Sequence, residues 1–120
     1  MKTRTDPRHI KRREAVRFLF SYLFNKEQPL DPAVKSIIDN LVEIDDKIVA
    51  SAPEWPIERI NKIDLSILRL AIFELLIKKT EPPKVIIDEA VELGKEFGSE
   101  NSASFINGVL GDVWKKNDLN

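Results

Sequence analysis

The chain has 120 residues, of which 42% are hydrophobic and 32% are charged, and its formal net charge at pH 7 is −1. This composition is typical of one folded, helix-rich domain and excludes an intrinsically disordered chain. Because it has no cysteine, disulfides, thiolate metal sites and thiol nucleophiles are excluded as well. No apolar run reaches the roughly 20 residues that span a bilayer, and the opening residues lack the apolar segment of a signal peptide. We therefore expect a soluble cytoplasmic protein with no membrane partner.

The chain opens with a basic arm, residues 1–13, that leads into the first predicted helix. Residues 1–17 hold seven basic side chains against two acidic ones, whereas the remaining 103 residues hold twelve basic and eighteen acidic groups. A basic arm on an acidic body indicates a polyanionic partner. The alternative is a solvated N-terminal tail.

The first helix is predicted to run from Asp6 or Pro7 to Lys26, with Asp6 as the N-cap and Pro7 in the first helical position. Two apolar stripes follow its length. The first stripe can face the core and consists of Ala15, Leu19, Tyr22 and Leu23. The second stripe has i, i+4, i+8 spacing and consists of Val16, Phe20 and Phe24. The second stripe is either covered by another helix of this chain or is an exposed patch that binds a partner.

The middle of the chain predicts a second helix and a proline-bounded link. Asp31 and Pro32 restart the helical pattern with a cap and a proline, and apolar residues at helical spacing continue to near Ser51. This segment is either one helix or two helices bent around residues 43–46. The link "APEWPIERI" contains a short helical turn.

Three further helices are predicted in the C-terminal half. The central one is the almost continuously apolar "DLSILRLAIFELLIKK", which Asp64 can cap. The next runs from about Pro83 to Phe97 with Gly98 as its C-cap, and the last begins near Ser99. Strand signals are nearly absent, so the fold class is all-α: one domain over residues 1–120, with about six to seven helices. Its N-terminal half spans about residues 7–52 and its C-terminal half about 56–117.

The sequence shows none of the residue patterns that are typical of a catalytic or metal site. The only histidine, His9, lies in the basic arm, so no second histidine is available for a metal site. Carboxylate pairs such as Asp88 with Glu92 are typical of a solvated face unless a pocket separates their pKa values. No Gly-rich phosphate loop is present. We expect no enzyme activity, no metal and no cofactor.

Three strings occur in one order: "RREAVRFLF", "IDLSILRLAIFEL" and "PPKVIIDEAVELGKEFGSENSASFINGVL". Together they resemble the NusB family of bacterial transcription antitermination factors, over residues 8–26 and 57–114. The resemblance implies an all-α fold of two small packed helical bundles without enzyme activity. It also implies binding of boxA-type single-stranded RNA together with the ribosomal protein NusE. The complex helps RNA polymerase, with other Nus factors, to read through terminators in ribosomal RNA operons.

The resemblance also assigns RNA-binding residues. The arginine-rich start of the first helix maps onto Arg8, Lys11, Arg12 and Arg13, with Arg4 as a flexible addition. Phe105 is the expected base-stacking residue near the arm, and a core aromatic is the alternative for it. Its neighbour Ser104 stands where many members have lysine. Gly111 replaces a common aspartate, and Arg17 replaces the usual glutamine and adds a positive charge near the arm.

The expected protein interface carries over to Phe20, Phe24 and Asp64, which fall where the family meets NusE. An N-cap role is the alternative for Asp64. Arg69 lies on an otherwise apolar helix, and we expect it to pair with Glu74 or Glu89 because an unpaired buried guanidinium is costly.

Two other functions remain open from the sequence. One is a pure interaction or oligomerisation module, such as a homodimer, with an incidental basic tail. The other is the accessory domain of a ribosomal RNA cytosine methyltransferase, which is disfavoured because the chain ends at Asn120 without a catalytic domain.

Overall fold

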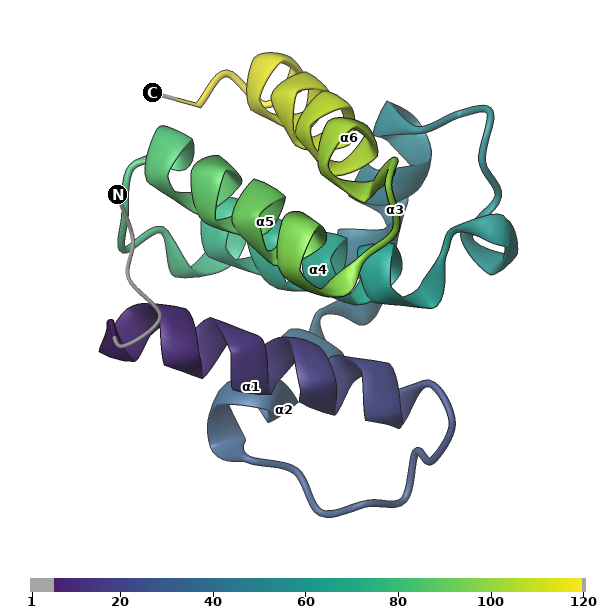
Figure 1. Ribbon diagram of the computed structural model, residues 1–120, viewed down its shortest axis with the longest axis vertical. Coiled ribbons are helices and arrows are strands. Elements are labelled where there is room, and N and C mark those ends of the chain that lie inside the picture. The colour runs from purple at the N-terminus through teal and green to yellow at the C-terminus, as the bar shows by residue number, and fades with distance from the viewer. Residues whose placement is uncertain (1–5, 120) are drawn as a thin grey trace.

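The computed structural model describes residues 6–119, which fold into helices without any strand (Figure 1). The α-helices are α1 (Pro7–Tyr22), α2 (Pro32–Asp39), α3 (Leu41–Ser51), α4 (Lys62–Phe73), α5 (Pro83–Phe97) and α6 (Ser102–Lys116). A 3₁₀ turn, η1 (Ile57–Arg59), precedes α4, and a π-helical turn, η2 (Glu74–Lys78), extends it. The all-α prediction is confirmed. No helix within this range has the length and apolar character needed to cross a membrane.

Helix α4 is the centre of the molecule. Every residue from Asp64 to Phe73 is buried. Helices α1 and α2 pack on one side of α4, and α3, α5 and α6 pack around the rest of it (Figure 1). The two packed groups of helices that the resemblance implies are therefore present, and both share α4. The buried apolar side chains of all six helices form one continuous cluster.

Several element boundaries follow from the predicted local signals. The side chain of Asp6 accepts a hydrogen bond from the Arg8 backbone N–H at 2.9 Å, and Asp31 caps α2 through Ala33 N–H at 2.8 Å. Proline occupies the first turn in both helices. Helix α5 runs from Pro83 to Phe97 as predicted, and Gly98 follows it.

Four predicted boundaries are wrong, because polar side chains compete for the backbone. Helix α1 ends at Tyr22 rather than Lys26, since the chain then turns and Asn25 accepts from the Glu27 N–H at 3.1 Å. The second helical segment breaks at Asn40 rather than at residues 43–46; the Asn40 amide donates to the Ser36 carbonyl at 2.7 Å.

The other two corrections concern helix starts. The N-cap of α4 is Asn61, which accepts from the backbone N–H groups of Ile63 and Asp64 at 2.8 and 3.2 Å, so Asp64 is not the cap. Helix α6 begins at Ser102 instead of Ser99, and the Ser99 N–H donates to the Ser102 hydroxyl at 2.8 Å.

The end of α4 departs from regular helix geometry. The chain passes directly from α4 into η2, and Lys79 then ends the turn in the left-handed region with φ 54°. Within this π-helical turn Glu74 is buried, whereas Lys78 is exposed. Turns of this kind are rare in helices and occur frequently at functional sites.

Candidate nucleic-acid and protein interfaces

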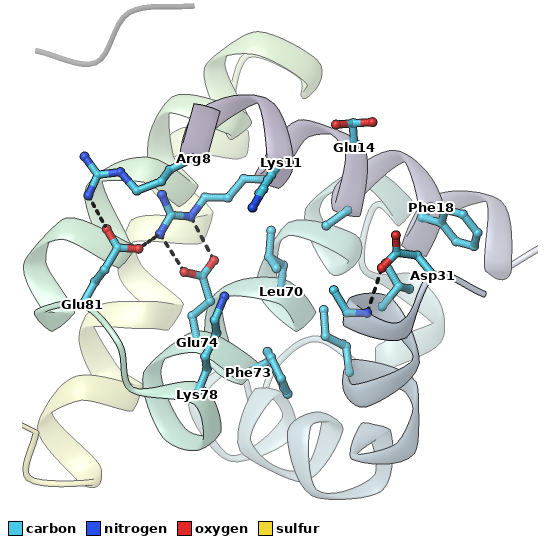
Figure 2. A pocket seen from close by; sticks show the side chains of 15 residues that line it. Arg8, Lys11, Glu14, Phe18, Asp31, Leu70, Phe73, Glu74, Lys78 and Glu81 are labelled. Atoms are coloured by element: carbon cyan, nitrogen blue, oxygen red, sulfur yellow. Dashed lines mark hydrogen bonds and ion pairs between the residues drawn. The ribbon is translucent and has the colours of Figure 1, made fainter. Parts of the chain in front are cut away.

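The basic side chains of α1 do not form one surface, because Arg12 is buried. Its guanidinium contacts Glu74 twice, with Nε 2.9 Å from Oε2 and Nη2 2.7 Å from Oε1 (Figure 2). It also donates to Glu89 at 3.2 Å and pairs with Glu81. The expectation that Arg12 faces RNA is therefore not met: this arginine joins α1 to η2, to the segment before α5 and to α5 itself.

The electrostatics of this cluster favour the charged arginine. Burial opposes the charged form of Arg12, but the hydrogen bonds and negative charges of Glu74 and Glu81 outweigh it and hold its pKa above the ordinary value. His9 is also buried here, with its ring nitrogens 3.4 Å from Glu89 Oε1 and 3.3 Å from Glu96 Oε1. His9, which the sequence places in the basic arm, is thus a buried residue of α1 whose ring faces two carboxylates of α5.

Two other cations of α1 lie on the side that faces α2 and η2. The Arg8 side chain is 61% exposed, and its Nη1 lies 3.4 Å from Glu81 Oε1. Lys11 is exposed next to it. Both line a cavity of about 580 Å³ between α1, α2, α4 and η2 (Figure 2). Arg4 lies outside the described residues.

Arg13 and Arg17 lie over one aromatic ring on the other side of α1. Their guanidinium carbons are 5.7 and 5.6 Å from the centroid of the Phe97 ring, at the end of α5. Arg13 is also 2.8 Å from Glu96 Oε2, as an ion pair that is not aligned as a hydrogen bond. Arg17 is exposed and forms no ion pair with another described residue. It is the most accessible cation of this pair.

Phe105 shares a shallow cavity with an aromatic residue that the sequence analysis missed. The Trp55 ring lies edge-on to Phe105 with centroids 6.3 Å apart, and Trp55 is 51% exposed. The cavity is about 290 Å³ and includes Ser104 and Gly108. Phe105 is half-buried against the core, which fits the core alternative, and its base-stacking role stays a prediction. The signal in the sequence was a tryptophan within the proline-bounded link, between Pro53 and Pro56.

The Trp55–Phe105 cavity is not beside the start of α1, contrary to expectation. In Figure 1, α1 begins at the left of the molecule and α6 begins at the right. Arg13 and Arg17 are linked to this cavity through Phe97. Their guanidiniums lie over the Phe97 ring, and the short connection 98–101 joins Phe97 to the start of α6. Ser104 is exposed on the first turn of α6, where its hydroxyl donates to the Asn101 carbonyl at 3.2 Å.

The second apolar stripe of α1 is divided between core and surface. Val16 is 1% exposed and belongs to the core, so for this residue the alternative of cover by the same chain holds. Phe20 is half-buried, and Phe24 is 66% exposed just beyond the helix end. Their rings are 5.2 Å apart between centroids at an interplanar angle of 59°. The two phenylalanines thus form a small aromatic patch at the C-terminal end of α1.

Asp64, the third expected interface residue, is 6% exposed in the first turn of α4. Burial raises the pKa of its carboxyl, and a hydrogen bond with Ser102 partly opposes this rise. Its Oδ1 is buried without a hydrogen-bond partner in the described part of the chain.

The expected partners of Arg69 are wrong. Its Nε and Nη2 donate to the two carboxylate oxygens of Asp45 at 3.0 and 2.9 Å. This bidentate pair joins α4 to α3. Glu74 and Glu89, which were expected to hold Arg69, instead hold Arg12.

The chain is similar to known proteins of one family. The NusB family model matches residues 29–115, from just before α2 to nearly the end of α6. The transcription antitermination protein NusB of Clostridium botulinum (strain Kyoto / Type A2) is 51% identical over 80 residues, or 67% of this chain. The protein of the same name from Pseudothermotoga lettingae is 49% identical over 82 residues, or 68% of this chain. The aligned regions cover 56% and 59% of those two proteins, so the match spans little more than half the length of these relatives.

Solved structures extend the likeness over the whole chain. T. maritima NusB superposes with a TM-score of 0.83 at 34% identity, covering 97% of this chain and 94% of that one. A chain from a structure described as a plectonemic RNA supercoil has the same fold, with a TM-score of 0.82 at 23% identity over 92% of this chain and 96% of its own.

Proposed function

Because the chain belongs to the NusB family, we propose that it is a non-enzymatic transcription antitermination factor that binds a single-stranded RNA and a protein side by side. The names of its relatives support this class of function. In its finer form the proposal is that the RNA is of boxA type, and that the protein is NusE within an RNA polymerase elongation complex at ribosomal RNA operons. Such a factor acts in the bacterial cytoplasm.

The observation that carries the RNA part is the pair of arginines over Phe97. Stacking on the ring holds both guanidiniums 5.6 to 5.7 Å from its centroid and lowers the entropy lost when they bind a phosphate. Each phosphate that they neutralise releases counterions. Arg17 replaces glutamine of the family pattern, so this chain adds a cation here. Arg8 and Lys11 add positive charge towards the start of α1, whereas Arg12 is excluded from the RNA-binding set by its burial.

Base recognition is proposed for the cavity between Trp55 and Phe105. Single-stranded RNA is read through unstacked bases that lie on aromatic or guanidinium planes. The cavity of about 290 Å³ between two rings is open on one side and suits one base. Ser104, at its edge, offers a hydroxyl where lysine is common in the family. A strand that crosses Arg13 and Arg17 would reach this cavity over the connection 98–101.

The protein partner is proposed to cover the Phe20–Phe24 patch. A 66% exposed phenylalanine stacked on a second ring is an apolar contact surface that a partner can remove from water. Asp64 belongs to the same face by the resemblance.

The RNA part is tested by fluorescence anisotropy with a labelled boxA-like RNA, with and without NusE. We expect NusE to tighten binding, and Trp55→Ala or Phe105→Ala to weaken it about 5- to 100-fold, the range of one lost base–aromatic stack. Val42→Ala, at an 81% exposed apolar side chain on α3, is the control and should leave affinity unchanged. Trp55 is half-exposed in a loop, so its loss should spare the fold. Unchanged affinity in Trp55→Ala would remove the base-stacking assignment.

The protein part is tested by isothermal titration with NusE. Phe24→Ser should abolish the complex while the helical circular dichroism signal is kept, because Phe24 lies outside α1 and is mostly exposed. Trp55→Ser is the matched aromatic control and should still bind NusE. If NusE binds but no RNA does, the chain is a protein-interaction module only.

A further inference from the structure

Apart from Arg8 and Lys11, which line it near the start of α1, the cavity of about 580 Å³ has no part in the proposed function. Its volume is in the range of small ligand and peptide-anchor pockets. Its floor is apolar and comes from three helices, with Phe18 from α1, Ile37 from α2, and Leu70 and Phe73 from α4. Lining residues of α1 run from Arg8 to Phe18, which is a length of ~15 Å at the helical rise per residue. The cavity is thus an elongated groove along α1.

The unpaired charges along this groove change sign from one side of Leu70 to the other, and Glu14 follows Lys11 by one turn of α1. Lys11 and Lys78 reach towards it from α1 and η2 (Figure 2), and neither forms an ion pair with another described residue. Glu14 and Asp31 lie on the far side of Leu70 (Figure 2), and Glu14 likewise has no ion-pair partner among the described residues. The remaining lining charges are already paired, since Glu74 and Glu81 hold Arg12 and Arg8.

Within the π-helical turn, Glu74 is already held by Arg12. Glu74 and Lys78 both line the cavity, and no ion pair joins them. The ammonium of Lys78 therefore has no carboxylate partner among the described residues. Lys79, held at φ 54°, ends the turn directly after it.

We propose that this groove binds a short amphipathic helix of a protein partner. The helix carries an acidic residue opposite Lys11 and Lys78, two or three apolar side chains over Phe73 and Phe18, and a basic residue opposite Glu14. An apolar floor with spaced anchors is the recognition mode of a helix in a groove, and the change in the sign of the unpaired charge along the groove fixes the direction of the bound segment.

A polyanionic occupant is disfavoured by the same residues. The lining has four basic and four acidic side chains, so it has no net charge: Arg8, Lys11, Arg12 and Lys78 against Glu14, Asp31, Glu74 and Glu81. RNA would meet the unpaired carboxylate of Glu14 at one end. The groove is also separate from the Trp55–Phe105 cavity, with which it shares no lining residue.

The test is selection from a displayed library of random peptides of about ten residues, the length that a ~15 Å helix supplies. We expect enriched peptides with an acidic residue, apolar residues at i, i+3 or i+4 spacing, and then a basic residue. The affinity for a synthesised copy of the most enriched peptide should fall about tenfold with Lys78→Glu and also with Glu14→Lys. Lys62→Glu is the control, because Lys62 is exposed and lines neither cavity. It should leave the affinity unchanged.

Three outcomes would overturn the proposal. The first is that the enriched peptides bind Lys78→Glu as tightly as the unchanged protein. The second is that a ten-nucleotide RNA displaces the most enriched peptide. The third is that sedimentation shows a self-association that Lys78→Glu abolishes. The last would make the occupant a second copy of this chain. Lys78 and Glu14 are outside the proposed RNA and NusE contacts. RNA and NusE affinities of both variants should therefore stay unchanged, which separates this proposal from the proposed function.

Discussion

Arg12 attaches α1 to the rest of the molecule through charge. It pairs with Glu74, Glu81 and Glu89, which lie on three different segments, while Glu89 is 1% exposed and has one oxygen without a hydrogen-bond partner among the described residues. A buried ion-pair cluster is weak evidence for net stability, but removing one member leaves uncompensated charge in the interior. The cluster therefore specifies where α1 packs.

Arg12→Met should lower the free energy of unfolding by about 3–5 kcal/mol, because Glu74 and Glu89 would be left buried without a cation. Arg8→Met should cost less than about 1 kcal/mol, since the Arg8 side chain is 61% exposed and its ion pairs are screened by water. Urea unfolding followed by circular dichroism measures both. An equal loss in the two variants would contradict the structural role of Arg12.

Asp64→Asn should stabilise the protein at neutral pH. The pKa of Asp64 is raised by burial in the folded state, so its contribution to stability is present at low pH and is lost as pH rises through the folded pKa. The variant should therefore match the unchanged protein in acid and exceed its free energy of unfolding above that pKa. Denaturant titrations over a pH series give this difference, and a gain that does not depend on pH would argue against the buried carboxylate.

The sequence indicated that Arg69 needs a carboxylate but not which one, and it did not indicate that Arg12 needs one at all. Arg69 pairs with Asp45, and Arg12, which was expected to bind RNA, pairs with Glu74 and Glu89. The partners are decided by how α1 and α3 cross α4, which places residues 24 to 77 positions apart in contact. Periodicity within one helix contains no information on such crossings.

At the scale of whole elements, local signals decided how well a helix could be predicted. Helix α5 has proline in its first turn and glycine after its last residue, and both ends were predicted correctly. The start of α6 and the end of α1 were missed because Ser102 and Asn25 bond to nearby backbone N–H groups and so move the boundary. The π-helical turn has no recognised sequence signal, so its position at the end of α4 was not predictable.

Alanine substitutions at Gly94 and Gly111 should change the free energy of unfolding in opposite directions. A Cβ at Gly94 would lie 2.9 Å from Ile106 Cδ1, so Gly94→Ala should destabilise by about 1–3 kcal/mol through overpacking. Nothing lies within 4 Å of a Cβ at Gly111, which is exposed within α6. Gly111→Ala should therefore stabilise by about 1 kcal/mol. Thermal unfolding of both variants checks the signs, and a stabilising Gly94→Ala would show that the α5–α6 contact has room to spare.

At the scale of the whole molecule, the proposed surfaces are spread over different parts of a small fold. The arginines over Phe97 and the Trp55–Phe105 cavity flank the connection between α5 and α6, the Phe20–Phe24 patch lies at the end of α1, and the groove lies between α1, α2 and η2. The sequence predicted a charged start and an apolar body for α1. It did not predict that burial of Arg12 would divide the charge between two sides of the helix, because that depends on tertiary packing.

The central claim is that Arg13 and Arg17, which lie over the Phe97 ring, bind RNA phosphates, and the salt dependence of RNA affinity tests it most directly. For single strands, each phosphate contact contributes about −0.7 to the slope of log K against log salt. Arg13→Gln with Arg17→Gln should therefore make the slope shallower by about 1.4 and weaken binding at low salt. Lys35→Gln with Lys84→Gln removes the same net charge at exposed sites away from α1 and should leave the slope nearly unchanged. A slope that is the same in the arginine variant and in the unchanged protein would contradict the account.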